Sequence, residues 1–421
     1  MSRRRQRPYR SCHYPVALCA ADSTANCRTL PLDINFDFDN RIERRDSDSY
    51  KWDDNKRLFG RADLLPFWVA DMDFATPAPV LQAIKNRCEH PILGYGKRSE
   101  EYYSAIQDWL KTRHGWDVPS EWLMFSPPSS IVGIGGIISV LTEPGDSIAA
   151  PTPTYGPLLG LVEQNGRRLI RNPLKETDGR YELDIDDLTQ KIAADTRMVV
   201  LCSPHNPVGR VFSRDELVAL SELAEEHDLI VVSDEVHCDL VLPGHRHLPF
   251  GSIGGERSVT VISPNKTFNT AGIPQSTLII PDEKIRARYQ VFLNTMQLNH
   301  DSTFGTEGMI AGYRHCAPWL DKLVVYLAAN HAMAETFFQE RIPAIRKTHA
   351  EATYLSWLDC RQLGLSQDEI MRRLVDIGGV GLYGGTEFGK EGEGFFRMNL
   401  ACPSEMLRRG LQGIEKALGD L

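Results

Sequence analysis

The stretch SPNKTFNTAG, Ser263–Gly272, places one lysine, Lys266, shortly after the apolar run SVTVIS at Ser258–Ser263. A short apolar run of this kind is typical of a buried strand, and the glycine that follows indicates a loop at its end. Most lysines are solvated surface residues, so the position alone assigns no function. The role of Lys266 therefore depends on which residues follow the other strands of the same sheet.

From Trp122 onward, seven short apolar runs alternate with amphipathic stretches. This alternation predicts an α/β fold in which helices cover a mostly parallel, seven-stranded sheet. We expect the strands at Trp122–Ser126, Asp146–Ala150, Arg167–Asn172, Met198–Ser203, Leu229–Ser233, Ser258–Ser263 and Ser276–Pro281.

Two helical stretches can be predicted from their local pattern. In Ser213–His227, Ser213 and Glu216 have the spacing of a capping box and precede leucines at helical intervals. A longer helical stretch is expected at about Phe304–Arg341, where it joins the sheet region to the C-terminal part.

The length of 421 residues favours a large domain and a smaller one, because single cores stop growing at smaller sizes. We expect a large domain at 76–315 and a smaller α+β domain at 316–421, which the segment 33–75 completes. Residues 1–32 are expected to be a disordered extension, since the first thirty hold six arginines and one acidic residue. A signal peptide is the alternative, but its apolar run YPVALCAA is short and contains Pro15.

The composition excludes several classes of protein. A net charge of -9 gives no electrostatic footprint for nucleic acid, and no stretch approaches the ~20 apolar residues that span a membrane. The nine cysteines are scattered without a CxxC pair, which favours reduced thiols in the cytoplasm and no metal site. Small, amino-acid-like partners remain open.

In open parallel sheets, ligands bind beyond the carboxyl ends of the strands, so the residues just after each strand are informative. Ser129 and Ser130 follow the first expected strand and open a helix-like run, where they form either an anion site or an ordinary N-cap. Tyr155 follows the second strand, and it either stacks on a planar ring or simply packs. Asn206 follows the fourth strand in PHNPVG, between two prolines.

Asp234 follows the fifth strand, in DEVH, where it is either a surface or N-cap carboxylate or a carboxylate at the end of a buried strand, which is costly unless it is paired. With Lys266, the strand ends thus supply a phosphate cradle, an aromatic ring, an amide, a carboxylate and an amine. Pyridoxal phosphate (PLP) requires all five, since its aldehyde takes a lysine as a Schiff base and a carboxylate keeps its pyridine nitrogen protonated. The ordered spacing of Asn206, Asp234 and Lys266 is the strongest part of this signal.

Several motifs carry a family resemblance: FWVADMDF (Phe67–Phe74), GYG (Gly94–Gly96), PHNPVGRVF, SDEVHCDL and SPNKTFNTAGI. From about Asp33 to its end, the chain resembles fold-type-I PLP enzymes of the aminotransferase superfamily. Within it, the closest match is the MalY/PatB group of cystathionine beta-lyase-like carbon-sulfur lyases. DEVH followed by CDL is the most discriminating motif, because ordinary aminotransferases more often have tyrosine where His237 stands.

The resemblance implies a role for each matching residue of the cofactor site. Lys266 is the Schiff-base lysine, Asp234 is the partner of the pyridine nitrogen, and Asn206 bonds the phenolic oxygen of the ring. Tyr155 stacks on the ring, and His237 either supports the phenolic side or merely packs. The expected phosphate ligands are Ser129, Ser130 and Ser263.

The resemblance also implies substrate contacts and a partner subunit. Arg397, in FFRMNLACP, matches the arginine that clamps the substrate α-carboxylate, whereas the sequence alone would suggest a solvated arginine. Trp68 and Ala70 are expected at the substrate. Tyr95 would reach the cofactor phosphate of a neighbouring subunit, which implies a homodimer with shared active sites.

The chain departs from the superfamily pattern at two places. The first loop reads PPSS where many relatives carry a glycine, which weakens the assignment of Ser129 and Ser130. Eight residues after Lys266 there is no arginine, although classical aminotransferases commonly place a phosphate ligand there. The missing arginine favours the lyase group.

The resemblance implies a carbon-sulfur beta-lyase that cleaves a cysteine S-conjugate to a thiol, pyruvate and ammonia. The substrate is either cystathionine-like or a bulkier S-cysteinyl compound of specialised metabolism. An aminotransferase or a decarboxylating deaminase would use the same cofactor residues, so both alternatives stay open. A PLP-fold regulator is disfavoured, because the residues before Asp33 are too few for a DNA-binding domain.

Overall fold

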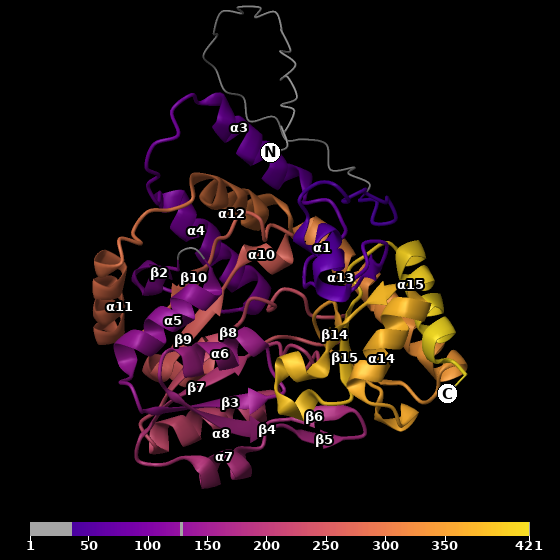
Figure 1. Ribbon diagram of the computed structural model, residues 1–421. Helices are drawn as coiled ribbons and strands as arrows, with labels where there is room; N and C mark the ends of the chain where they lie inside the picture. Colours follow the sequence, from indigo (N-terminus) through magenta and orange to yellow (C-terminus); the bar gives the residue numbers. More distant parts are fainter. Residues whose placement is uncertain (1–35, 127–128, 421) are drawn as a thin grey trace, which may run out of the picture. The chain divides into compact units, whose positions relative to one another are not determined.

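A seven-stranded sheet forms the centre of the computed structural model, which describes residues 36–126 and 129–420 (Figure 1). Its strand order is β2-β10-β9-β8-β7-β3-β4. The strands are β2 (Leu123–Phe125), β3 (Ser147–Thr152), β4 (Arg168–Pro173), β7 (Thr196–Cys202), β8 (Ile230–Asp234), β9 (Ser258–Ile262) and β10 (Thr277–Ile279). Strand β10 is antiparallel to both neighbours, and the other pairs are parallel. All seven expected strands and the mostly parallel sheet are confirmed.

Helices cover both faces of this sheet. Successive side chains of a strand point to opposite faces, and in these strands the side chains on both faces are apolar. In β7, Met198 and Val200 pack in a core with α5 (Ser130–Leu141), α6 (Gly156–Gln164) and α11 (Glu283–Thr295). The intervening Val199 and Leu201 pack in a second core with α7 (Ile185–Lys191) and α8 (Arg214–Glu226). The α/β layering expected from the sequence is therefore confirmed.

Helix α8 begins at the predicted capping box. The Ser213 hydroxyl accepts a hydrogen bond from Glu216 N at 3.2 Å, and the Glu216 carboxylate accepts one from Ser213 N at 2.8 Å. These two bonds satisfy amide groups that the first turn of a helix leaves unpaired.

The long helical stretch expected at Phe304–Arg341 is divided into α12 (Thr303–His315) and α13 (Ala317–Arg341). Pro318, in the first turn of α13, explains the break at Cys316. Its ring clashes with the carbonyl four residues earlier and it has no N–H to continue the helix. Helix α12 packs against α3 (Ala78–Glu89) and α4 (Glu100–Trp109) (Figure 1).

A smaller antiparallel sheet lies in the C-terminal part and has the order β11-β12-β15-β14. Its strands are β11 (Arg346–Lys347), β12 (Leu355–Asp359), β14 (Tyr383–Gly384) and β15 (Phe395–Asn399). Its hydrophobic core includes residues of α13, α14 (Gln367–Arg373) and α15 (Ser404–Leu418). The expected smaller α+β unit is thus present.

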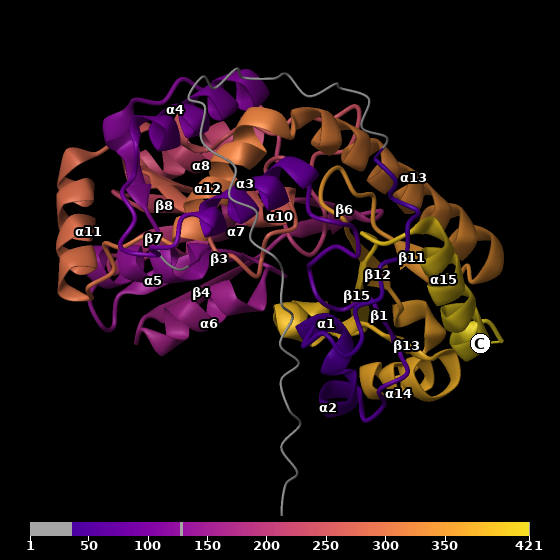
Figure 2. The ribbon, with the colours of Figure 1, turned by 90° about the horizontal axis from the view of Figure 1, so that it is seen from above.

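The early part of the chain packs against this C-terminal unit. Strand β1 (Leu65–Pro66) pairs in parallel with β13 (Val380–Gly381) (Figure 2), and it follows the short helices α1 (Tyr50–Asp53) and α2 (Asn55–Phe59). Trp52 and Phe67 enter the C-terminal core. From Asp37 onward the chain forms one compact unit, within which the domain boundaries at 76 and 316 stay predictions.

Short elements also lie outside these two sheets. They include the hairpin strands β5 (Lys175–Thr177) and β6 (Arg180–Glu182) and the short helices α9 (Gly251–Gly254) and α10 (Pro264–Thr267).

Three other sequence expectations concern the chain as a whole. In the described part of the chain, no helix is long and apolar enough to cross a bilayer. The six described cysteines, Cys88, Cys202, Cys238, Cys316, Cys360 and Cys402, are free thiols. The expected extension at 1–32 lies outside the described residues.

Candidate active site

A cavity of about 440 Å³ lies beyond the carboxyl ends of the parallel strands. Ten residues expected from the sequence line it, namely Ala70, Ser129, Ser130, Tyr155, Asn206, Asp234, His237, Ser263, Lys266 and Arg397. Trp68 and Tyr95 do not line it. The parallel sheet explains the grouping, because the carboxyl ends of its strands meet at one edge.

Lys266 enters the cavity from α10, the short helix that follows β9. Ser263 caps this helix, since its hydroxyl accepts a hydrogen bond from Asn265 N at 3.2 Å and donates one to Gln275 O at 2.7 Å. Lys266 Nζ donates to Ala70 O at 2.8 Å. Burial, helped by the charge of Arg397, lowers the pKa of Lys266 to about 8. A substantial fraction of the amine is therefore neutral near physiological pH, as a nucleophile or base requires.

Asp234 is the last residue of β8 and is 3% exposed. Within residues 36–126 and 129–420, its carboxylate accepts one long hydrogen bond, 3.4 Å from Val236 N. Burial raises its pKa to about 7. A buried carboxylate with so little support favours a cationic ligand group, which would also return its pKa to a lower value.

Arg397 lies on β15 and is 2% exposed, so the solvated alternative is wrong. Its Nη2 donates to Trp68 O at 2.6 Å, and its Nη1 donates to Asn206 Oδ1 at 3.3 Å. Among the described residues, its Nε has no hydrogen-bond partner, and its acceptors are an amide oxygen and a carbonyl, not a carboxylate. Burial lowers its pKa to about 10. A guanidinium kept without an anion in a cavity matches a carboxylate ligand.

Trp68 contributes to the site through its backbone alone. Its side chain is fully buried outside the cavity, where the indole Nε1 donates to Asn55 Oδ1 at 3.1 Å. Its carbonyl holds Arg397. Trp68 is thus absent from the cavity lining, and its expected place at the substrate stays a prediction.

Ser129 and Ser130 lie at the start of α5. Ser129 is the N-cap residue, but its hydroxyl makes no capping hydrogen bond. The first amide groups of a helix have no partners inside the helix and carry a partial positive charge. This helix start can therefore bind an anion such as phosphate with both hydroxyls at hand.

Tyr155 and His237 leave their predicted roles open. Tyr155 is a half-buried residue of the cavity wall at the start of α6. His237 is buried, and its Nδ1 has no partner among the described residues. Burial, together with the charges of Lys266 and Arg397, lowers the pKa of His237 to about 3. The imidazole is thus neutral at physiological pH, whether it contacts a cofactor or only packs against Tyr354.

Tyr95 is not brought to the cavity of its own subunit. Its side chain is 87% exposed and its ring lies 4.4 Å from the ring of His300, centre to centre. A role in the site of a neighbouring subunit stays a prediction.

Sequence patterns did not reveal four further wall residues, Tyr50, Tyr383, Glu387 and Phe388. The rings of Tyr383 and Phe388 lie 5.1 Å and 4.8 Å from the guanidinium carbon of Arg397. No local motif marks these positions. They reach the cavity only because the two ends of the chain fold together.

One group of potential metal ligands exists in the described part of the chain, His114, Cys238 and Asp239. Hydrogen bonds already engage both oxygens of Asp239. Oδ1 bonds to Trp109 Nε1 at 3.0 Å and to His114 Nε2 at 2.9 Å, while Oδ2 accepts from Thr267 Oγ1 at 2.8 Å. Since Thr267 follows Lys266, this cluster supports the short helix that carries the lysine.

The unsatisfied groups of the cavity fit PLP together with an amino acid. The start of α5 suits a phosphate, Asp234 suits a protonated ring nitrogen, and the free donor of Arg397 suits a carboxylate. Lys266 supplies the amine that a cofactor aldehyde requires. Each part of the two molecules thus has a matching group on the cavity wall.

The sequence and the fold are similar to those of characterised proteins. The family Aminotransferase class I and II matches residues 62–414. The chain is 41% identical to cystathionine beta-lyase PatB of Bacillus subtilis, across 90% of this chain and 99% of that protein. It is 32% identical to protein MalY of Escherichia coli, across 91% and 99% of the two chains.

A solved structure agrees with these relatives. The PLP-bound C-S lyase of Staphylococcus hominis superposes with a TM-score of 0.86 at 31% identity, and the match covers 92% of this chain and 99% of that one. Together with the matched cavity, these similarities confirm the expected family. The chain belongs to the aminotransferase class I and II family, as a PLP-dependent, cystathionine beta-lyase-like carbon-sulfur lyase.

Proposed function

We propose that the protein cleaves a cysteine S-conjugate, cystathionine-like or bulkier, to a thiol, pyruvate and ammonia. The observation that carries this proposal is the combination of Lys266, Asp234 and Arg397 in one cavity, where none of the three has an ion-pair partner among residues 36–126 and 129–420. The similarity to PatB and to the Staphylococcus hominis lyase supports elimination as the reaction.

The cofactor would be held by residues that the sequence already indicates. Lys266 would be its covalent anchor, Asp234 would face the pyridine nitrogen, and Asn206 would face the phenolic oxygen. Tyr155 would stack on the ring, and the phosphate ligands would be Ser129, Ser130 and Ser263. When bound, PLP supplies an electron sink for the pair that remains when the α proton leaves.

The remaining steps use side chains of this protein. Arg397 would bind the α-carboxylate through its free Nε and one terminal nitrogen, which fixes the amino acid for proton removal. Lys266 Nζ would take the α proton, and the resulting ammonium can donate to Ala70 O, as it does in the structure at 2.8 Å. The thiolate then leaves from the β carbon, and the three-carbon remainder is hydrolysed to pyruvate and ammonia.

We further propose that the protein works as a homodimer with shared active sites. The loop that carries Tyr95 also exposes Ile92 and Leu93, at 68% and 61%. An exposed apolar loop is typical of an interaction surface. Light scattering should give twice the chain mass, and Tyr95→Phe should weaken cofactor retention if the hydroxyl reaches a partner's phosphate. The free thiols favour a reducing compartment, so we propose the cytoplasm.

The test of the proposed reaction is product identification by mass spectrometry. The purified, PLP-loaded protein is incubated with L-cystathionine and, separately, with a bulkier S-substituted cysteine. Pyruvate together with a free thiol establishes elimination, and the ratio of the two rates shows which substituent the cavity prefers. A keto acid or an aldehyde that retains the carbon-sulfur bond contradicts elimination and indicates transamination or decarboxylating deamination.

A further inference from the structure

The segment Trp68–Met72 has an unusual set of hydrogen bonds. It lies outside the helices and strands, yet the carbonyl groups of its five residues all accept hydrogen bonds from side chains. The donors are Arg397 to Trp68 O (2.6 Å), Asn399 to Val69 O (2.5 Å), Lys266 and Tyr354 to Ala70 O (2.8 and 2.9 Å), Asn399 and Lys51 to Asp71 O (2.6 and 3.1 Å), and Asn269 and Arg44 to Met72 O (3.0 and 3.1 Å). We call Trp68–Met72 the carbonyl segment. It contacts both cations of the proposed site.

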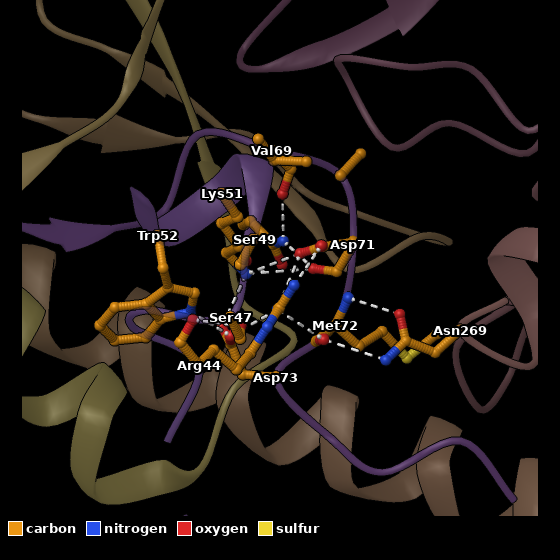
Figure 3. Close-up of polar contacts among 12 residues, drawn as sticks. Arg44, Ser47, Ser49, Lys51, Trp52, Val69, Asp71, Met72, Asp73 and Asn269 are labelled. Carbon is orange, nitrogen blue, oxygen red and sulfur yellow. Dashed lines mark hydrogen bonds and ion pairs between the residues drawn. The ribbon is translucent and has the colours of Figure 1, made fainter. Parts of the chain in front are cut away.

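A partly buried charge network fixes one side of the carbonyl segment (Figure 3). Lys51 is 1% exposed, and its Nζ lies 2.6 Å from Asp73 Oδ2 and 3.3 Å from Asp71 Oδ1. Arg44 bonds to the same carboxylates, at 2.7 Å to Asp71 and 2.8 Å to Asp73. The Trp52 indole also donates to Asp73, at 2.8 Å. These groups are paired with one another, and none of them lines the cavity of the proposed active site.

Asn269 lies in the turn that follows α10, the helix of Lys266, and it bonds to Met72 of the carbonyl segment (Figure 3). Its Oδ1 accepts from Met72 N at 3.0 Å, and its Nδ2 donates to Met72 O at 3.0 Å and to Phe74 O at 2.8 Å. Its φ of +54° lies in the left-handed region, which asparagine tolerates better than most residues. Thr76 fixes it further, by donating to Asn269 O at 2.9 Å.

We propose that Asn269 is a positioning residue, which sets the carbonyl groups of Trp68 and Ala70 against Arg397 and Lys266. The two cations share one backbone segment, so a displacement of that segment misplaces the carboxylate clamp and the base together. Misplacement by about 1 Å is enough to reduce a rate 100-fold in an active site. The proposal rests on the functions of Lys266 and Arg397 proposed above, but it does not depend on which bond is cleaved.

The test variant is Asn269→Gly in the PLP-loaded protein. Glycine accepts the positive φ, so this change removes the three side-chain hydrogen bonds with little backbone strain. Asp178→Gly is the matched control, because Asp178 also has a positive φ, of +50°, and lies exposed in the β5–β6 hairpin. Leu220→Ala, at a buried position of α8 in the hydrophobic core, controls for a general loss of stability. Thr76→Val is a milder second variant if Asn269→Gly folds poorly.

Two measurements separate positioning from stability. The first is the Kd for α-methyl-L-serine, which is determined from the change in visible absorbance of the loaded protein. This amino acid has no α proton, so its Kd reports binding alone. The second is kcat as a function of pH. We expect Asn269→Gly to raise the Kd about tenfold and to lower kcat about tenfold. The acid limb of kcat should move to lower pH, because an ammonium that loses the Ala70 acceptor gives up its proton more easily.

Each outcome decides the proposal. It is supported if Asn269→Gly, or more weakly Thr76→Val, changes Kd, kcat and the acid limb while Asp178→Gly and Leu220→Ala leave them as in wild type. It is wrong if Asn269→Gly lowers Tm alone, or if Leu220→Ala produces the same kinetic changes. A separate experiment tests the proposed function on which this inference rests. If a Lys266→Ala protein keeps the wild-type absorbance band, Lys266 is not the covalent anchor of the cofactor.

Discussion

Two lysines of the described chain, the buried Lys51 and the half-buried Lys266 of the cavity wall, lie in opposite electrostatic settings. Lys51 lies between Asp71 and Asp73, and although burial opposes its charge, the two carboxylates outweigh burial and raise its pKa. Lys266 has a carbonyl as its hydrogen-bond partner, and burial lowers its pKa to about 8. One charge is satisfied within the chain, and the other is left for a ligand.

The same contrast holds for the carboxylates and the arginines of the two regions. Burial opposes ionisation of Asp71, but Lys51 and Arg44 lower its pKa, whereas burial raises the pKa of Asp234 to about 7. Carboxylates raise the pKa of Arg44 despite burial, while burial lowers the pKa of Arg397 to about 10. Because an unpaired buried charge destabilises a fold, its retention indicates a function in binding or catalysis.

The largest expected effect follows from Lys266→Met. Removal of the covalent anchor and base should lower kcat/KM by about 10⁴-fold or more, since acid-base catalysis alone contributes up to that factor. The same change removes a half-buried amine whose hydrogen-bond partner is a carbonyl and not a carboxylate, so the cofactor-free variant should have a Tm equal to or above that of wild type. Activity assays and thermal unfolding of the cofactor-free protein check both expectations. Retained turnover, or a large loss of Tm, would contradict this description of Lys266.

The identical substitution at Lys51 should give the opposite stability result. Lys51→Met leaves Asp71 and Asp73 with one cation instead of two, and breaking a buried pair costs about 3–5 kcal/mol. Chemical denaturation of the cofactor-free protein measures the loss. Lys175→Met is the control, because Lys175 also pairs with two aspartates but is exposed to solvent, which predicts a much smaller loss than at Lys51. Equal losses at the two lysines would refute the structural role of the network.

Arg397→Lys tests whether Arg397 binds the substrate carboxylate through two parallel N–H donors or only through its positive charge. We expect kcat/KM to fall about 10–100-fold, mostly through KM, because an ammonium cannot reproduce the paired donors of a guanidinium. Arg361→Lys is the matched control. Arg361 also lies over an aromatic ring, at 4.6 Å from Phe395, but it is exposed outside the cavity. If Arg397→Lys keeps the KM of wild type, the α-carboxylate binds elsewhere.

Asp234→Asn predicts a pH dependence of stability with a defined sign. The pKa of Asp234 rises from 3.8 to about 7 on folding, so the folded state holds its proton more tightly. Ionisation of buried Asp234 therefore lowers the free energy of unfolding. This loss is absent below pH 3.8, grows as the pH rises toward 7, and is constant above pH 7. Asp234→Asn should therefore stabilise the cofactor-free protein at pH 8 by about 1–3 kcal/mol and leave stability unchanged at pH 3.5. A pH-independent effect would mean that Asp234 is ionised normally.

Sequence patterns predicted the central sheet well, because its signals are local. Each strand is a short apolar run, and the capping box at Ser213 marks the start of α8. The grouping of Asn206, Asp234 and Lys266 also follows from the sequence, since parallel strands bring their carboxyl ends together. Periodicity overlooked the break at Cys316, although Pro318 was a readable signal for it.

The parts that could not be predicted depend on contacts between distant segments. Tyr50, Tyr383 and Glu387 reach the cavity only after β1 pairs with β13, more than 300 residues later in the chain. Lys51 and Asp73 are ordinary charged residues in the sequence, and only the fold buries them together. The predicted role of Tyr95 requires a second subunit, so it depends on an interface that a single chain does not contain.

The smallest expected effect is that of His237→Phe, at the position that distinguishes DEVH from ordinary aminotransferases. Burial, together with the charges of Lys266 and Arg397, lowers the pKa of His237 to about 3, so the imidazole carries no charge at neutral pH in the cofactor-free protein. Phenylalanine keeps the ring that packs at 5.9 Å from Tyr354. If His237 only packs, kcat/KM should change less than about tenfold, with the same pH profile between pH 6 and 9. A larger loss, restored in part by His237→Gln, would show that a ring nitrogen donates to the cofactor. The free Nδ1 of His237 would then belong with Asp234, Lys266 and Arg397 to the groups that the chain leaves unpaired for its ligands.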